Sequence, residues 1–247
     1  MLGLRTFWDA CKDIFEDMFL AIAGNLFWCA VALPLPYLAL VMYQRGLYAG
    51  VVVCALLAPL LFAIASGALT TLARRMVDGK ATPWRMLLSG VPHQLGRRIV
   101  VMYLWSVVFY TVLLNIWFYG GMQFANGMVA IFFFDVALIW LALLGFLLPI
   151  HETLGQVHYS RLFRNAVGLM FFVALPALVF LVLGSVLLVF SALTILPLLF
   201  FFGILMALWG TRMSDAAIKK LEERTQSEAT DDAADGERRP VGQVRPK

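Results

Sequence analysis

The stretch GVVVCALLAPLLFAIASGALTTLA, residues 50–73, contains no Asp, Glu, Lys, Arg or His. A helix needs about 20 consecutive apolar residues to cross the hydrocarbon core of a bilayer, so this stretch has the length and composition of a transmembrane helix. The whole 247-residue chain has the same character, because 62% of its residues are hydrophobic and 14% are charged. In soluble domains about half the residues are apolar and about a quarter are charged. The sequence therefore predicts a polytopic integral membrane protein.

Other segments of the chain share this composition and are separated by short or charged connections. One helix over 166–211 would be about 69 Å long at ~1.5 Å per residue, too long for one crossing, so we place a break near Ser191. In the first span Pro34 and Pro36 are expected to kink the helix or to close it early, because proline lacks the N–H that continues a helix, and we favour early closure. The predicted fold is all-α, a polytopic membrane helical bundle over 18–211 with six transmembrane helices, at 18–43, 50–73, 99–120, 128–150, 166–189 and 193–211.

Positive charge is confined to one side of this arrangement. Every Lys and Arg except Arg45 lies in the N-terminal segment, in the connections 74–98 and 151–165, or in the C-terminal tail. Basic residues accumulate on the cytoplasmic side of membrane proteins. Both termini are therefore predicted to be cytoplasmic, in a multi-pass membrane protein. This orientation accounts for the net charge of +4, and we expect no nucleic-acid binding.

An amphipathic helix is predicted over residues 1–17, ahead of the first span. Its apolar side chains recur every three or four residues, which is the period of a helix. Two placements fit this pattern: the helix lies in the membrane interface with Phe7 and Trp8 among the headgroups, or it docks against the bundle. The apolar positions are Leu4, Phe7, Trp8, Cys11, Ile14, Phe15 and Met18, and Arg5, Asp9, Lys12, Asp13, Glu16 and Asp17 lie between them.

Two cytoplasmic segments carry local signals of their own. In the connection 74–98, Thr82-Pro83-Trp84 is typical of a helix start, with a hydroxyl N-cap and a proline in the first turn. Residues 212–247 form the cytoplasmic tail. After about residue 220 the tail is too poor in large apolar residues to bury a core, so we predict disorder there.

Three polar residues lie within the predicted spans. Asp135 in the fourth span and Asn115 in the third lie at similar depth near the outer end, because the two spans run in opposite directions. They form either a hydrogen bond that fixes the two helices or a proton or substrate contact in an outward cavity, unless Asp135 lies nearer the interface. Asn25 in the first span is expected to make a helix–helix contact.

Small residues four positions apart occur in two spans. Ala63 and Gly67 form such a pair in the second span, and Gly203 and Ala207 form one in the sixth. Because small side chains let helix backbones approach closely, we interpret both pairs as packing contacts.

Catalytic and metal-binding constellations are not evident in the sequence. His151, Glu152 and His158 follow the fourth span, but their spacing differs from that of an HExxH metal site. We expect interfacial polar residues instead, with Glu152 pairing Arg161 or Arg164. The three cysteines have no paired spacing, and no nucleophile has a base nearby. We therefore predict no catalytic residue, no metal and no cofactor.

Three segments resemble the YesL-like family of bacterial membrane proteins, a domain of unknown function. They are GNLFWCAVALPLP (24–36), ARRMVDGKATPW (73–84) and LPIHETLGQVHYSRLFRNAVGLM (148–170). The resemblance extends over about residues 10–212, and the loop 85–98 departs from it because it lacks a phenylalanine- and lysine-rich stretch. The resemblance implies six spans, a bacterial inner membrane and a link to carbohydrate uptake. It implies no catalytic residues.

Two functions remain in competition at this point. The first is a non-enzymatic accessory or permease-like component that works through a membrane-protein partner and is linked to carbohydrate uptake. The alternative is a small secondary transporter that uses Asp135 and Asn115 and acts as a homo-oligomer, since six spans are few and no inverted repeat is visible. An intramembrane enzyme ranks third, because the expected catalytic groups are absent from the sequence.

Overall fold

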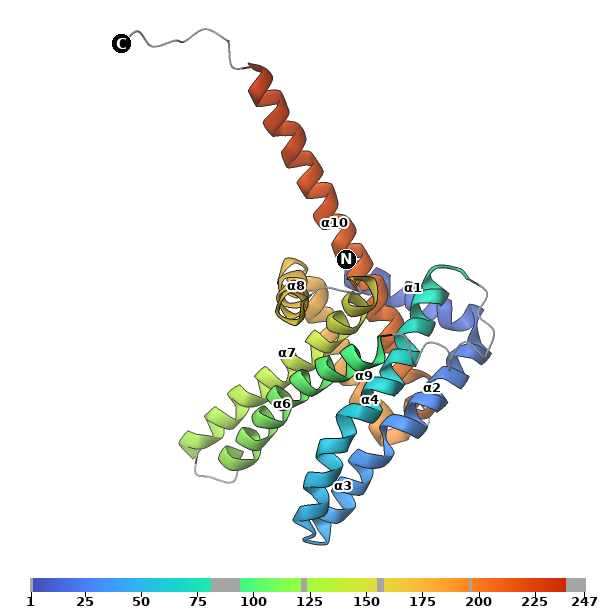
Figure 1. The fold of residues 1–247 in the computed structure, drawn as a ribbon, viewed down its shortest axis with the longest axis vertical. Coiled ribbons are helices and arrows are strands. Elements are labelled where there is room, and N and C mark those ends of the chain that lie inside the picture. The colour runs from blue at the N-terminus through green and yellow to red at the C-terminus, as the bar shows by residue number, and fades with distance from the viewer. Residues whose placement is uncertain (1, 81–93, 121–123, 155–157, 196, 239–247) are drawn as a thin grey trace.

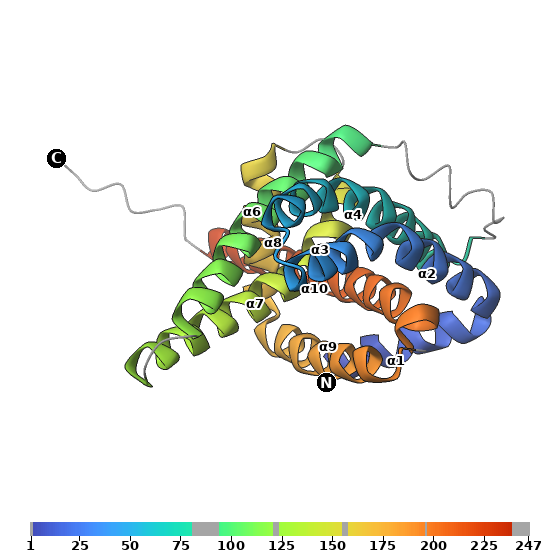
Figure 2. The same cartoon turned by 90° about the horizontal axis from the view of Figure 1, so that it is seen from below.

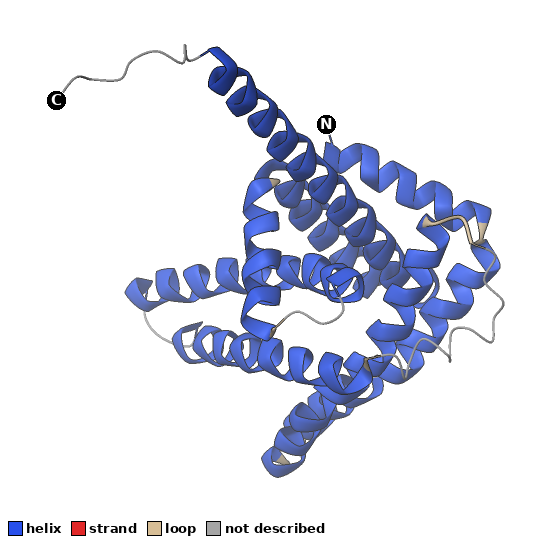
Figure 3. Ribbon diagram, turned by 45° about the horizontal axis from the view of Figure 1, so that its top comes forward, coloured by secondary structure: helices blue, strands red, loops and turns tan. Residues whose placement is uncertain are grey.

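The all-α prediction is confirmed over the part of the chain that the computed structural model describes, residues 2–80, 94–120, 124–154, 158–195 and 197–238 (Figure 1). Within these ranges every regular element is a helix (Figure 3). The elements are α1 (Leu2–Glu16), α2 (Met18–Ala32), α3 (Pro34–Gln44), α4 (Tyr48–Val77), α6 (Leu95–Gly120), α7 (Phe124–Leu154), α8 (Tyr159–Phe172), α9 (Ala174–Thr194), the π-helix η1 (Leu198–Phe202) and α10 (Gly203–Arg238).

Six helical segments among the described residues are long and apolar enough to cross a membrane. Two pairs of them, α3–α4 and α6–α7, diverge towards their far ends, while α10 projects from the opposite end of the bundle, near the N-terminus (Figure 1). The predicted polytopic membrane bundle is thus confirmed. The segments are Met18–Gln44, Tyr48–Val77, Leu95–Gly120, Gly127–Thr153, Ala174–Ser191 and Leu198–Ser227.

The fifth span begins later than predicted. The sequence placed it at 166–189, but residues up to Phe172 belong to α8, a separate helix that packs against α7 (Figure 1). Pro176 explains the break, because it has no N–H to bond to the carbonyl of Phe172 and is tolerated only in the first turn of α9. The amphipathic α8 buries Leu162 and leaves Arg161 exposed.

Two predicted helix ends are also displaced. Pro34 does not close the first span, which continues to Gln44, but the helix is interrupted between Ala32 and Pro34, as the kink alternative predicted. This proline is the first residue of α3, where a missing N–H costs nothing. Helix α10 continues to Arg238, although disorder was predicted after about residue 220. Residues of high helix propensity propagate a helix whose preceding turns are held by the bundle up to the buried Ala217. The predicted helix start at Thr82 lies outside the described residues.

Helix α1 docks against the bundle and also has an exposed apolar face. Trp209 of α10 is fully buried, and its Nε1 donates to Gly3 O and Thr6 Oγ1, both at 3.2 Å. The helix lies beside α9 in the view from below (Figure 2). Leu4, Trp8 and Phe15 remain exposed. Their spacing of four and seven residues places them on a single face, so the docking and interfacial placements are compatible.

Helices α7 and α10 cross at two glycines. A Cβ on Gly210 would lie 2.5 Å from the carbonyl oxygen of Gly145, closer than any real Cβ contact. Pro149 contributes to this crossing, because its missing N–H leaves the carbonyl of Gly145 without its usual partner in α7. The released carbonyl therefore faces the bare backbone of α10.

Side chains of α6 form hydrogen bonds to α4 and to α7. One of them donates to a carbonyl of α4 that a proline leaves without its usual partner. Pro59 lies inside α4 and cannot donate to Ala55 O, which instead accepts from Tyr110 Oη at 3.2 Å. Trp105 and Trp140 donate to each other's backbone carbonyls, at 3.1 and 3.0 Å. These bonds fix the register of α6 against both neighbours.

Gly210→Ala is expected to lower the free energy of unfolding by about 1–3 kcal/mol, because the new methyl group overlaps backbone that cannot rotate away. Gly168→Ala is the matched control, since a Cβ at this position of α8 meets nothing within 4 Å. Thermal and denaturant unfolding in mild detergent measures both. Equal stability of the two variants would contradict a backbone contact between α7 and α10.

Candidate functional site

Asn25 makes the predicted helix–helix contact, and its target is the π-helix. The side chain is fully buried, and its Nδ2 donates to Leu198 O and Leu199 O, both at 2.7 Å. Its Oδ1 accepts from the backbone N–H of Ile204 at 3.0 Å. A Cβ on Gly203 would lie 2.7 Å from Asn25 Oδ1. Gly203 is therefore small because it accommodates this amide, and Asn25 compensates for the interrupted ladder of η1.

The predicted hydrogen bond between Asn115 and Asp135 is not formed. Asn115 Nδ2 donates to Thr111 O of its own helix at 2.7 Å. Asp135 is exposed and has no hydrogen-bond or ion-pair partner among the described residues. Aromatic rings occupy the interface instead, where Tyr119 of α6 stacks on Phe133 of α7 with centroids 6.0 Å apart. The structure thus leaves a carboxylate on the surface of an apolar helix.

A buried ion pair that the sequence analysis missed joins α6 to α7. Arg98 is 1% exposed, and its Nη2 lies 2.9 Å from Glu152 Oε2. Thr71 of α4 donates to the other carboxylate oxygen, Oε1, at 3.1 Å. These three residues, named the polar cluster below, connect α4, α6 and α7.

The partner predicted for Glu152 was therefore wrong. Glu152 binds Arg98 instead of Arg161 or Arg164 because α7 remains helical to Leu154 and keeps the carboxylate against α6. Arg161 and Arg164 lie on the exposed side of α8. Arg98 lies in the first turn of α6 and Glu152 lies in the last turn of α7, so the two residues are at the same depth in the bundle. This equal depth is the feature of the sequence that could have predicted their pairing.

Gly67 accommodates the guanidinium of Arg98 on the side of α4. A Cβ on Gly67 would overlap Arg98 Nη1. The contact is therefore made to an arginine side chain, and the interpretation of Ala63 and Gly67 as a helix–helix packing pair was incomplete. Arg98 Nη1 and His151 Nε2 are buried without a hydrogen-bond partner among the described residues. Unpaired buried polar atoms cost about 1–3 kcal/mol each, so the cluster is not optimised for stability alone.

A second layer of ion pairs ties α1, α10 and α4 together near the polar cluster. Arg212 donates from Nε and Nη2 to the two carboxylate oxygens of Asp13, both at 2.5 Å. Arg74 donates from Nη1 to the two carboxylate oxygens of Asp215, at 2.5 and 2.7 Å. Arg74 lies one turn beyond Thr71, so both layers mark the same end of the bundle, called the basic end below.

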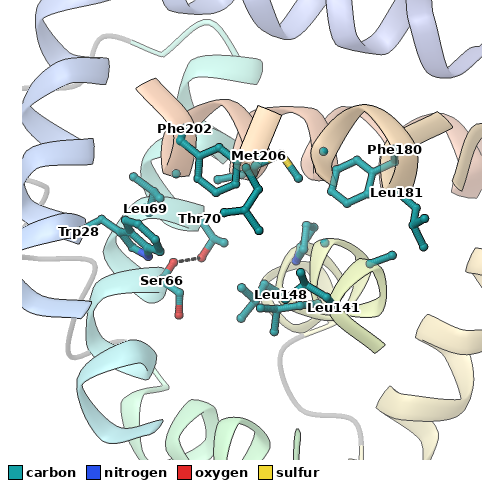
Figure 4. A pocket seen from close by; sticks show the side chains of 18 of the residues that line it. Trp28, Ser66, Leu69, Thr70, Leu141, Leu148, Phe180, Leu181, Phe202 and Met206 are labelled. Atoms are coloured by element: carbon teal, nitrogen blue, oxygen red, sulfur yellow. Dashed lines mark hydrogen bonds between the residues drawn. The ribbon is translucent and has the colours of Figure 1, made fainter. Parts of the chain in front are cut away.

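An apolar cavity of about 270 Å³, the chamber, lies between α2, α4, α7, α9, η1 and α10 (Figure 4). Ser66 and Thr70 line it, but their hydroxyls donate to Phe62 O at 2.5 Å and to Ser66 O at 2.9 Å in their own helix. Other side chains lining it include Trp28, Leu69, Leu141, Leu148, Phe180, Leu181, Phe202 and Met206.

The chamber extends along α7 between Asp135 and the polar cluster. Glu152 follows Leu148 by one turn, and Asp135 precedes Leu138 by three residues and Ala142 by seven. At about 100° per residue Glu152 lies about 40° from Leu148, whereas Asp135 lies about 140° from it and is exposed. The ion pair at the basic end therefore continues the side of α7 that faces the chamber, and the Asp135 carboxylate is not part of the lining.

Metal and thiol chemistry find little support in the described residues. No group of three or more His, Cys, Asp or Glu side chains there could hold a metal ion. Cys11, Cys29 and Cys54 are free, and burial raises the pKa of the Cys11 thiol above its ordinary value. At neutral pH the Cys11 thiol is accordingly uncharged and a weak nucleophile.

The fold and the site together define a multi-pass α-helical membrane protein with a buried ion pair beside an apolar chamber. The chain matches no protein-family model, no curated protein and no solved structure.

Arg98→Met is expected to lower the free energy of unfolding by about 3–5 kcal/mol, because it leaves the Glu152 carboxylate without its cation between three helices. The double variant Arg98→Met/Glu152→Met should be more stable than Arg98→Met, since it removes the orphaned charge. Denaturant unfolding in mild detergent gives the coupling free energy.

The matched control is Arg161→Met, which removes an exposed arginine of α8 and should change stability by at most about 0.5 kcal/mol. Gly67→Ala tests the contact from α4 and should cost less in the Arg98→Met background than in the original chain. Strict additivity of Arg98 and Glu152 would rule out an energetic pair.

Proposed function

We propose that the protein is a non-enzymatic component of a bacterial inner membrane, of the YesL-like type, that acts as an accessory to carbohydrate uptake. Both termini are cytoplasmic in this proposal. Its support is the concentration of Lys and Arg in the segments at the basic end, which the positive-inside rule assigns to the cytoplasm. The resemblance of residues 24–36, 73–84 and 148–170 to the YesL-like family supplies the link to carbohydrate uptake.

The observation that carries the accessory role is the apolar lining of the chamber. A sugar presents hydroxyl groups that each need a hydrogen-bond partner when water is removed. Ser66 and Thr70 already donate to their own helix, and the rest of the lining is dominated by hydrocarbon side chains. This favours a protein that assists a carbohydrate transporter over one that conducts the sugar itself as a permease.

The basic end offers surfaces for a membrane-protein partner. Helix α10 extends about 30 Å beyond Ala217, the last buried residue among its described side chains, at ~1.5 Å per residue. Arg161 and Arg164 are exposed on α8. Charged, exposed helices that lie outside the hydrocarbon are suited to transient contacts with the cytoplasmic parts of a transporter.

A chain that ends at Ser227 tests the partner-binding role of α10. It keeps Lys220 and Arg224 over the ring of Phe172, at 5.9 and 5.2 Å, and removes the distal part of the helix. Unfolding temperature should be unchanged, because the truncation lies beyond the buried part of α10. Recovery of transporter components after cross-linking and co-purification from membranes should fall several-fold. Equal recovery by both chains, or no growth defect on any sugar after deletion, would count against the accessory role.

Asp135 supports the alternative, a small secondary transporter that acts as a homo-oligomer. An exposed carboxylate in an apolar helix is costly in hydrocarbon and is usually paired, protonated or beside water. Association of two copies through this face of α7 would remove Asp135 from lipid and place it beside a shared path.

Under this alternative, Asp135→Asn should abolish proton-driven uptake of a sugar into proteoliposomes without lowering the unfolding temperature. Phe134→Leu is the matched control, because it changes the exposed apolar neighbour of Asp135 and keeps the carboxylate. Uptake that ignores both the proton gradient and Asp135→Asn would exclude the transporter.

A further inference from the structure

We propose that the chamber holds one acyl chain of a membrane phospholipid, which enters sideways from the leaflet at the basic end. This inference does not depend on the link to carbohydrate uptake. It rests on the size of the chamber, the chemistry of its lining and its position along the transmembrane helices.

The size of the chamber fits a single hydrocarbon chain. Along α7 the lining runs from Leu138 to Pro149, about 16 Å at ~1.5 Å per residue. A volume of about 270 Å³ spread over this length describes a narrow, elongated space. An extended hydrocarbon chain that lies parallel to the spans fits it.

The chemistry of the lining selects for hydrocarbon. Leu141, Phe180 and Met206 point towards the space between the helices (Figure 4), and the hydroxyls of Ser66 and Thr70 are occupied within α4. Apolar cavities of only ~150 Å³ stay dry and take up apolar ligands such as benzene. Inside a bilayer the abundant apolar ligand is the acyl chain of a phospholipid, so this is the expected occupant.

The position of the chamber assigns the leaflet. Its lining on α4 and α7 ends at Thr70 and Pro149, next to Thr71 and Glu152 of the polar cluster. A chain that fills the chamber from this end keeps its headgroup near the ion pairs and exposed basic residues of the basic end, such as Arg5 and Lys219. Anionic headgroups are attracted to such residues. Towards the other end the lining stops at Phe62 of α4 and Leu138 of α7, well short of the ends of these spans at Tyr48 and Gly127.

The test uses the full chain in vesicles of phosphatidylethanolamine and phosphatidylglycerol that contain a phosphatidylcholine with a diazirine in one acyl chain. After irradiation, mass spectrometry locates the adducts. We expect adducts on chamber residues such as Met206 and Leu148, at a yield that saturates near one lipid per chain. Adducts confined to exposed side chains such as Phe171 and Val186 would overturn the proposal.

Ser185→Phe fills the chamber and should lower the yield at Met206 about tenfold, whereas Val186→Phe, the next residue on the exposed side of α9, should leave it unchanged. Gly184→Leu is a second filling variant, since a Cβ there meets only the flexible end of Met206 at 2.9 Å. The unfolding temperature shows which variants fold. Labelling of Met206 that persists in a folded filling variant, or Met206 cross-links to a second protein chain, would overturn the proposal.

Discussion

Hydrocarbon offers no hydrogen-bond partner, so each backbone carbonyl that a proline or a helix break releases needs a donor or a close contact inside the bundle. This constraint explains how the helices are joined. Ala55 O, released by Pro59, accepts from Tyr110 of α6. Leu198 O, at the π-helix, accepts from Asn25 of α2. The carbonyl of Gly145, released by Pro149, faces α10. The carbonyls released at these irregular positions thus make the contacts that hold different helices in register.

Ion pairs serve the same purpose at the basic end, where the helices leave the apolar core. Arg98 is buried between α4 and α7, and Arg212 joins α10 to Asp13 of α1. Both arginines also belong to the basic residues from which we infer the proposed orientation. Because a buried ion pair often adds little net stability, we interpret its main effect here as specifying which helices are neighbours. The same residues therefore pair the helices and support the proposed orientation.

The amino-acid composition and the hydrophobic periodicity were sufficient to predict the fold class, but they did not predict which residues make contacts between spans. The apolar stretch at 50–73 predicts a crossing whatever it touches, and Asn25 is deep enough in its span to predict an interhelical contact. Arg98 was taken for a loop charge, although it lies in the first turn of α6. Its partner is 54 residues away in sequence, and helical period alone does not identify neighbours between helices. The start of α9 was misplaced for a different reason, since hydropathy continues smoothly across Pro176.

The chamber and the polar cluster are structurally connected, because both are built on α4 and α7. Ser66 and Thr70 face the chamber, while Gly67 and Thr71, each about 100° further round α4, face the polar cluster. On α7, Pro149 lies between the two and removes the hydrogen bond that would stiffen the helix there. Leu148 lines the chamber and Glu152 follows it by one turn, so the chamber wall and the ion pair lie on either side of this position of α7. On α4, Gly67 leaves room for the guanidinium of Arg98. The chamber wall and the buried ion pair are therefore built from the same two helices.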